Sequence, residues 1–140
     1  MDIDDCILRA DHADDTEHLR RIMSDLLFPK EKKKPRRMRH PDSIIQKKNK
    51  RCYLCQLVDN NYNQHRYIVR HHIYDGPNRK ISEENGFVVY LCVKHHREGP
   101  EAVHNNSAMN RMIQRACQRV YERSHSRQEF MELIGRSYLE

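Results

Sequence analysis

Two short motifs with the same internal spacing most constrain how this chain can fold. Two residues separate Cys52 from Cys55, and the same spacing separates Cys92 from His95, where Cys92 lies near the end of the apolar run FVVYLCV. Two such pairs can supply the four thiol and imidazole ligands of a tetrahedral structural zinc site. The sequence therefore predicts one zinc ion held by these four residues. The alternative is that they are coincidentally spaced residues of an ordinary core.

The composition of the chain gives such a site a role in folding. The 140 residues amount to one domain, only 37% are hydrophobic, and the mean hydropathy is −1.01. A core this lean needs stability from another source, and metal binding provides it. The acidic start MDIDDC has no signal-peptide pattern, and no apolar run approaches the ~20 residues that span a bilayer. We therefore expect a cytoplasmic protein that binds no membrane.

The net charge of +6 conceals an acidic and a basic block. Residues 1–25 carry eight acids against three bases, and residues 30–51 carry eleven bases against two acids. This asymmetry favours a polyanionic partner for the basic block, although a merely solvating linker is the alternative. We expect an acidic helical segment at 1–28 with a helix at about 15–27, a solvated basic arm at 29–50, and a folded domain at 51–140.

The domain is expected to belong to the α+β class. Between residues 52 and 99 the sequence predicts short strands in YLCQLV, RYIVRHHIY and GFVVYLCV, separated by turn-rich segments. Apolar pairs recur every four residues over 106–123 and predict a helix with one buried face. Ser126 and Glu129 form a capping box that opens a last short helix, which Gly135 is placed to end. The result is a small zinc-stapled core with flanking helices.

Arginines also recur every four residues on the helix predicted at 106–123. They form a slanted ridge, which is either a solvated face or a surface that follows a phosphate backbone. The candidates for contact with nucleic acid on this ridge are Arg111, Arg115 and Arg119.

Histidines not used by the zinc pairs indicate a second metal. Six of the ten histidines lie within residues 65–104. Adjacent strand residues point to opposite faces, so His71 and His72 should not both bind one ion. One of them can hold a divalent ion such as Mg²⁺ or Mn²⁺ together with His96, while the other takes a proton from water. Asn78 or Asn85 can supply a third polar ligand. The alternative is one packed and one exposed histidine.

The combined motif resembles the HNH endonucleases of the ββα-metal class in their zinc-knuckle form. Over residues 50–140, the chain is similar to small phage and prophage HNH proteins related to the recombination-enhancing, RecA-dependent nucleases. The motif consists of Cys52-x-x-Cys55, Arg70-His71-His72-Ile73, an asparagine and Leu91-Cys92-x-x-His95-His96.

The resemblance implies a role for each matching residue. His72 becomes the general base, and His71 and His96 become ligands of the catalytic metal. Spacing from His72 favours Asn85 as the middle asparagine, whereas the Gly-Pro-Asn-Arg-Lys run favours Asn78. His104 completes the metal shell or contacts phosphate. Further phosphate contacts are expected from Arg79 and Lys80, although simple solvation of these two side chains is an equal alternative.

The sequence thus predicts a metal-dependent DNA endonuclease, in a bacterial or phage-infected cell, that hydrolyses phosphodiester bonds. Its partners would be DNA and, through the N-terminal segment, a recombinase or another protein. The rival hypothesis is a non-catalytic zinc module that binds DNA or protein.

Overall fold

The computed structural model describes residues 13–27 and 34–139, and the chain divides into two compact units, Met1–Arg37 and Met38–Glu140. In the first unit the predicted helix is confirmed as α1 (Ala13–Leu27). Its apolar residues Leu19, Ile22 and Leu26 are exposed. The rest of the predicted acidic segment, and the start of the basic arm at 29–33, lie outside the described residues.

The second unit is built on a two-stranded antiparallel sheet. Strands β1 (Val69–His72) and β2 (Val88–Leu91) pair so that His71 lies opposite Val89 and His72 opposite Val88. These strands confirm two of the three predicted extended segments. The connection contains the 3₁₀ turn η1 (Gly76–Asn78) and the short helix α3 (Arg79–Glu84), where the sequence indicated only turns. The unit is therefore of mixed α+β character.

The third extended segment was predicted incorrectly, since YLCQLV forms helix α2 (Tyr53–Val58). The physical reason lies in the spacing of the thiols. On a strand, residues three apart point to opposite faces, whereas one helical turn brings them to the same side. Cys52 is the N-cap of α2 and Cys55 lies in its first turn, so the helix directs both thiols to one side.

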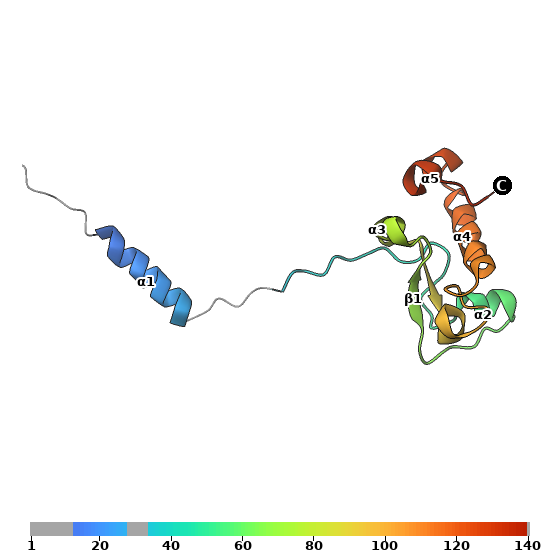
Figure 1. The fold of residues 1–140 in the computed structure, drawn as a ribbon, viewed down its shortest axis with the longest axis horizontal. Coiled ribbons are helices and arrows are strands. Elements are labelled where there is room, and N and C mark those ends of the chain that lie inside the picture. Colours follow the sequence, from blue (N-terminus) through green and yellow to red (C-terminus); the bar gives the residue numbers. More distant parts are fainter. Residues whose placement is uncertain (1–12, 28–33, 140) are drawn as a thin grey trace, which may run out of the picture. The chain divides into compact units, whose positions relative to one another are not determined.

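Two helices follow the sheet after a single π-helical turn, η2 (Lys94–Glu98). They are α4 (Ser107–Tyr121) and α5 (Arg127–Ile134) (Figure 1). The capping box of Ser126 and Glu129 is present, and Gly135 ends α5 with φ of +95°. Within the described ranges, no helix is long and apolar enough to cross a membrane.

The buried face of α4 differs slightly from the apolar stripe of the sequence. Ala108 and Met112 are exposed, although both belong to the stripe. In their place two glutamines are buried, and each of them binds backbone or side-chain groups. The buried positions of α4 are Met109, Ile113, Gln114, Cys117 and Gln118.

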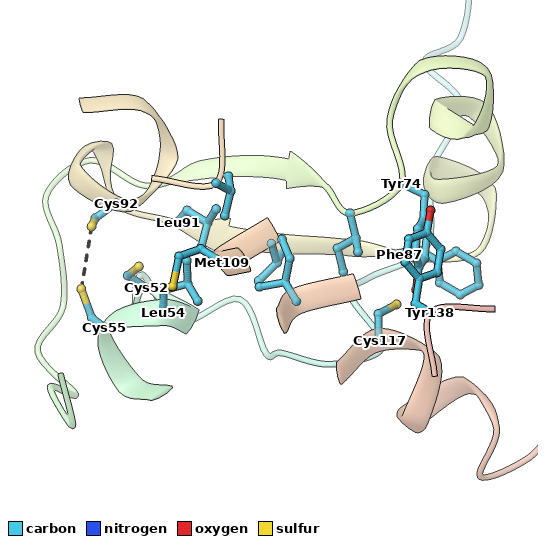
Figure 2. Close-up of a cluster of buried hydrophobic side chains, with 14 of the residues drawn as sticks. Cys52, Leu54, Cys55, Tyr74, Phe87, Leu91, Cys92, Met109, Cys117 and Tyr138 are labelled. Carbon is cyan, nitrogen blue, oxygen red and sulfur yellow. Dashed lines mark hydrogen bonds between the residues drawn. The ribbon is translucent and has the colours of Figure 1, made fainter. Parts of the chain in front are cut away.

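The core has a thiol end and an aromatic end. Figure 2 shows Cys52, Cys55 and Cys92 together at one end, and Tyr74, Phe87 and Tyr138 at the other. At the aromatic end the rings of Tyr74 and Phe87 meet edge to face, with centroids 5.5 Å apart. The hydroxyl of Tyr74 donates to the carbonyl of Gln114 at 2.7 Å, which ties the end of the hairpin to α4.

The second half of the predicted basic arm packs against the domain instead of remaining solvated. The Ser43 hydroxyl donates to the Val88 carbonyl at 2.5 Å, and the amide of Ile44 donates to the Gly86 carbonyl at 3.1 Å. The side-chain oxygen of Gln46 accepts from the amide of Tyr90 at 2.9 Å. These bonds satisfy polar groups along β2, which explains why this part of the arm is held in place.

Substitutions at two glycines with positive φ test whether the packing of the arm against the domain contributes to stability. In Gly86→Ala, the new Cβ would collide with the Asp42 carbonyl, and φ is +69°. In Gly76→Ala, φ is +60° but nothing lies within 4 Å of the Cβ. Backbone strain alone should lower the free energy of unfolding of the Gly76→Ala variant by about 1 kcal/mol. Strain and the collision together should lower that of the Gly86→Ala variant by about 3 kcal/mol. Urea unfolding measures both values; equal losses would show that the Asp42–Gly86 contact contributes nothing.

Candidate metal centres

Three thiols and one imidazole converge at the thiol end of the core. The Sγ atoms of Cys55 and Cys92 are 3.8 Å apart. His95 Nδ1 lies 3.5 Å from the Sγ of Cys52, 3.3 Å from that of Cys55 and 3.5 Å from that of Cys92. All four residues are buried. The sequence therefore identified a set of side chains that the fold does bring together.

The separations match those around a tetrahedral zinc ion. Zinc binds sulfur at about 2.3 Å and imidazole nitrogen at about 2.0–2.1 Å, so a tetrahedron places two sulfurs about 3.8 Å apart, and a sulfur and a nitrogen about 3.6 Å apart. The observed distances agree with both values. The cluster could accordingly hold a metal ion such as zinc.

Three separate elements position these ligands. Cys52 and Cys55 belong to the start of α2, Cys92 directly follows β2, and His95 lies in the turn η2. The amide of His96 donates to the Cys92 carbonyl at 2.9 Å, which closes the turn between the last two ligands. One ion would thus join the start of the domain to the end of its sheet.

The environment of the thiols favours their protonated form when no cation is bound. Burial raises the pKa of Cys52 despite two backbone hydrogen bonds that lower it, and burial, then the charge of Cys52 and hydrogen bonding to the other thiols, raises the pKa of Cys55. Free thiols here would therefore stay protonated at neutral pH. A metal ion binds thiolates, so its binding would release protons and couple the site to pH.

The second ring nitrogen of His95 faces carboxylates. Its Nε2 is buried without a hydrogen bond among the described residues, and it lies 3.8 Å from Asp59 Oδ2 and 3.6 Å from Glu101 Oε2. A carboxylate near the outer nitrogen of a metal-bound histidine orients the ring and increases its basicity. Neither acid was singled out from the sequence, and both become recognisable only from the fold.

A second group of ligands is formed by His71, His96 and His104. One ring nitrogen from each lies within 4.8 Å of the others. The Nε2 atoms of His96 and His104 are 3.2 Å apart, and the ring of His71 meets both other rings edge to face. This grouping brings His104 together with His71 of β1 and His96 of η2, so these three residues could hold a metal ion.

The electrostatics of this cluster favour neutral imidazoles. Burial lowers the pKa of His71 to about 4, with smaller contributions from His104 and His96. Burial and His104 also lower the pKa of His96. Neutral imidazole is the form that binds metals. His71 and His96 are therefore ready to bind a cation at neutral pH without first losing a proton.

The donor set narrows the choice of metal. Imidazole nitrogens suit borderline ions such as Zn²⁺, Ni²⁺ or Cu²⁺, whereas Mg²⁺ and Mn²⁺ prefer carboxylate and water oxygens. The charge of Asp75 acts on His71 and opposes the lowering of its pKa, so one carboxylate does lie near the cluster. Three imidazoles thus fit Zn²⁺, Ni²⁺ or Cu²⁺ better than the Mg²⁺ or Mn²⁺ expected from the sequence.

His72 lies beside this cluster and contacts an acid. Its Nε2 is 3.3 Å from Glu83 Oε1 but is not aligned for a hydrogen bond, and that oxygen accepts one from Arg70 Nη1 at 3.4 Å. The interaction with His72 is the largest cause of a lowered pKa at Glu83. Sequence analysis missed Glu83 because it belongs to α3, a helix that the turn-rich segment did not predict.

A cavity of about 240 Å³ opens beside His72 and the three clustered histidines. Arg79 lines it, as predicted for a phosphate contact, and Arg70 and Arg97 line it as well. Lys80 does not: its side chain is 85% exposed and pairs with Glu84 at 3.7 Å. The cavity therefore combines possible metal ligands, a histidine with a carboxylate partner, and guanidinium groups that suit a phosphate.

The structure brings neither candidate asparagine to this cavity. Asn78 Nδ2 donates to the carbonyl of Ile134 at 3.0 Å, and Asn85 Nδ2 donates to the carbonyl of Ile81 at 2.9 Å. Both side chains thus complete the backbone bonding of helix ends, a common use of asparagine.

The arginine ridge is partly structural. Arg115 Nε donates to the Tyr138 carbonyl at 3.1 Å, and the Arg111 guanidinium lies 5.4 Å from the centre of the Tyr138 ring. Arg119 is exposed and lines a surface hollow with Arg115. Two of the three arginines predicted to contact nucleic acid therefore also hold the C-terminal segment.

Comparison of the chain with protein-family models, curated proteins and solved structures gives no match. Function is accordingly argued from the arrangement of side chains.

The thiol cluster makes a prediction about metal content. Cys92→Ser should lose one equivalent of zinc and unfold the second unit, because the buried site would lack one ligand. Elemental analysis and circular dichroism measure the two effects. The control is Cys117→Ala, which removes a buried thiol outside the cluster and should retain the zinc. A folded wild-type protein without zinc would contradict the assignment.

Proposed function

We propose that the protein is a metal-dependent DNA endonuclease of the HNH type, with a ββα-metal centre formed by the hairpin and the turn after it. One observation carries the proposal: three histidine nitrogens converge beside His72, in a cavity edged by arginines. A structural zinc site alone would need none of these groups.

The proposal assigns a different task to each histidine. His71, His96 and His104 hold a divalent cation, which when bound polarises the scissile phosphate and stabilises the leaving oxygen. Glu83 keeps the proton on Nε2 of His72 and fixes the ring. Nδ1 of His72 is then the nitrogen that accepts a proton from the attacking water, as in other carboxylate–histidine pairs.

Arginines around the cavity would hold the DNA backbone. Arg70, Arg79 and Arg97 come from three different elements of the domain and line one hollow. Guanidinium groups bind phosphate oxygens in pairs and carry no information about base sequence. The basic residues between 30 and 51 add affinity of the same kind, so we expect cleavage that depends strongly on salt and weakly on sequence.

The direct test is cleavage of supercoiled plasmid with Mg²⁺, Mn²⁺, Zn²⁺ or Ni²⁺ supplied separately. His72→Ala should lower the rate by about 100-fold or more, since it removes the general base but no metal ligand. Its control is His125→Ala, because His125 is exposed and stacks on Tyr121 with ring centroids 4.1 Å apart. That variant should cleave like the wild type.

The same assay distinguishes the nuclease from the rival function, a non-catalytic zinc module. The thiol cluster has a complete ligand set of its own, which is the observation that favours a non-catalytic zinc module. If the wild-type protein retards DNA in a gel but leaves it intact with all four metals, the nuclease proposal fails.

The role of Glu83 as a positioning residue has its own test. Glu83→Gln should slow cleavage by about tenfold while metal content stays unchanged, because the carboxylate orients His72 and binds no metal. Glu84→Gln is the matched control, since Glu84 is the neighbouring acid and pairs with exposed Lys80. Equal rates for the two variants would remove Glu83 from the proposed mechanism.

A further inference from the structure

We propose that a second cavity, next to the histidine centre, binds one unpaired nucleotide of the DNA strand. The inference rests on the proposed function, since it names the kind of DNA that the same site would take. The cavity measures about 470 Å³ and lies between η1, the first turns of α4 and the segment after α5. Asp75 lines both this cavity and the histidine cavity, so the two hollows adjoin.

An unpartnered acceptor points to a ligand with N–H groups. Asn110 lines the cavity, and its Oδ1 is shielded from solvent with no hydrogen-bond partner among the described residues. An acceptor without a donor costs free energy, and a turn of the Asn110 side chain toward the cavity would let a ligand recover it. The exocyclic amino groups of adenine, cytosine and guanine are donors of this kind.

Two guanidinium groups at the same cavity suit the charged part of a nucleotide. Arg111 and Arg136 line it, and they lie 5.4 and 4.7 Å from the centre of the Tyr138 ring. Stacking on the ring leaves the N–H edges of a guanidinium available to phosphate oxygens. The aromatic ring itself is held by a 2.7 Å bond from the Tyr138 amide to Gln118 Oε1.

A base can enter such a hollow only after leaving the helical stack. Unstacking and unpairing cost a few kcal/mol in a duplex and much less in a single strand, flap or gap. The cavity therefore implies a preference for DNA with unpaired nucleotides. The phosphate beside the unpaired nucleotide would reach the histidine centre, because the cavities share a wall.

The test compares binding of a fluorescent single-stranded oligonucleotide with binding of the matching duplex. Zinc-loaded full-length His72→Ala protein is the parent, so that neither DNA is cleaved. The parent should bind the single strand more tightly than the duplex. Adding Asn110→Ala or Arg136→Ala should weaken single-strand binding by about tenfold and change duplex binding less than about twofold.

The matched control is Arg66→Ala, because Arg66 also stacks on a tyrosine, with its guanidinium 5.3 Å from the Tyr67 ring, and it does not line this cavity. It should leave the ratio of the two affinities unchanged. The inference is overturned if the parent shows no preference, or if the cavity variants weaken both DNAs equally. If the wild-type protein cleaves plasmid but the parent shows no preference for single-stranded DNA, the nucleotide-binding role of the cavity is refuted and the proposed nuclease function is not. If the parent shows the preference but the wild-type protein does not cleave plasmid, the nuclease function is refuted and the role of the cavity is not.

Discussion

The rest of the domain depends on the convergence of three thiols and one imidazole at one point. This cluster links the start of α2 to the end of β2 and the adjoining turn η2, which lie much further along the chain. The chain has a lean apolar composition, so a metal ion in this position would replace part of the stability that larger domains obtain from their cores. The separations of the ligand atoms fit a tetrahedral ion without rearrangement.

The same cluster determines where the histidine centre lies. His95 turns into the core, and His96, the next residue in η2, consequently faces away from the thiols. Pairing of β1 with β2 brings His71 to the same place, and the backbone amide of Val103 donates to the His95 carbonyl at 2.9 Å, which holds His104 nearby. Adjacent residues thus contribute to two different centres, and disruption of the first would displace the second.

The sequence was informative where chemistry requires a fixed spacing, and uninformative where contacts depend on the fold. The ligand pairs, both strands and the capping box follow from local patterns, and so does the place of His71 and His96. Helix α2 was missed because a short apolar run has no distinct period. Glu83, Asp59 and Glu101 were missed because their partners lie elsewhere in the fold, and Asn110 was missed because segments far apart in the sequence form its cavity. The two candidate asparagines, Asn78 and Asn85, bond to helix carbonyls instead.

The most direct measurement is anomalous scattering from crystals of the full chain grown with a transition metal. The account predicts two separate peaks, one among Cys52, Cys55, Cys92 and His95, and one among His71, His96 and His104. Data collected on both sides of the zinc absorption edge would identify zinc at the first position. A structure with no metal at the thiols, or with a metal there and none at the three histidines, would contradict the division of neighbouring histidines between two centres.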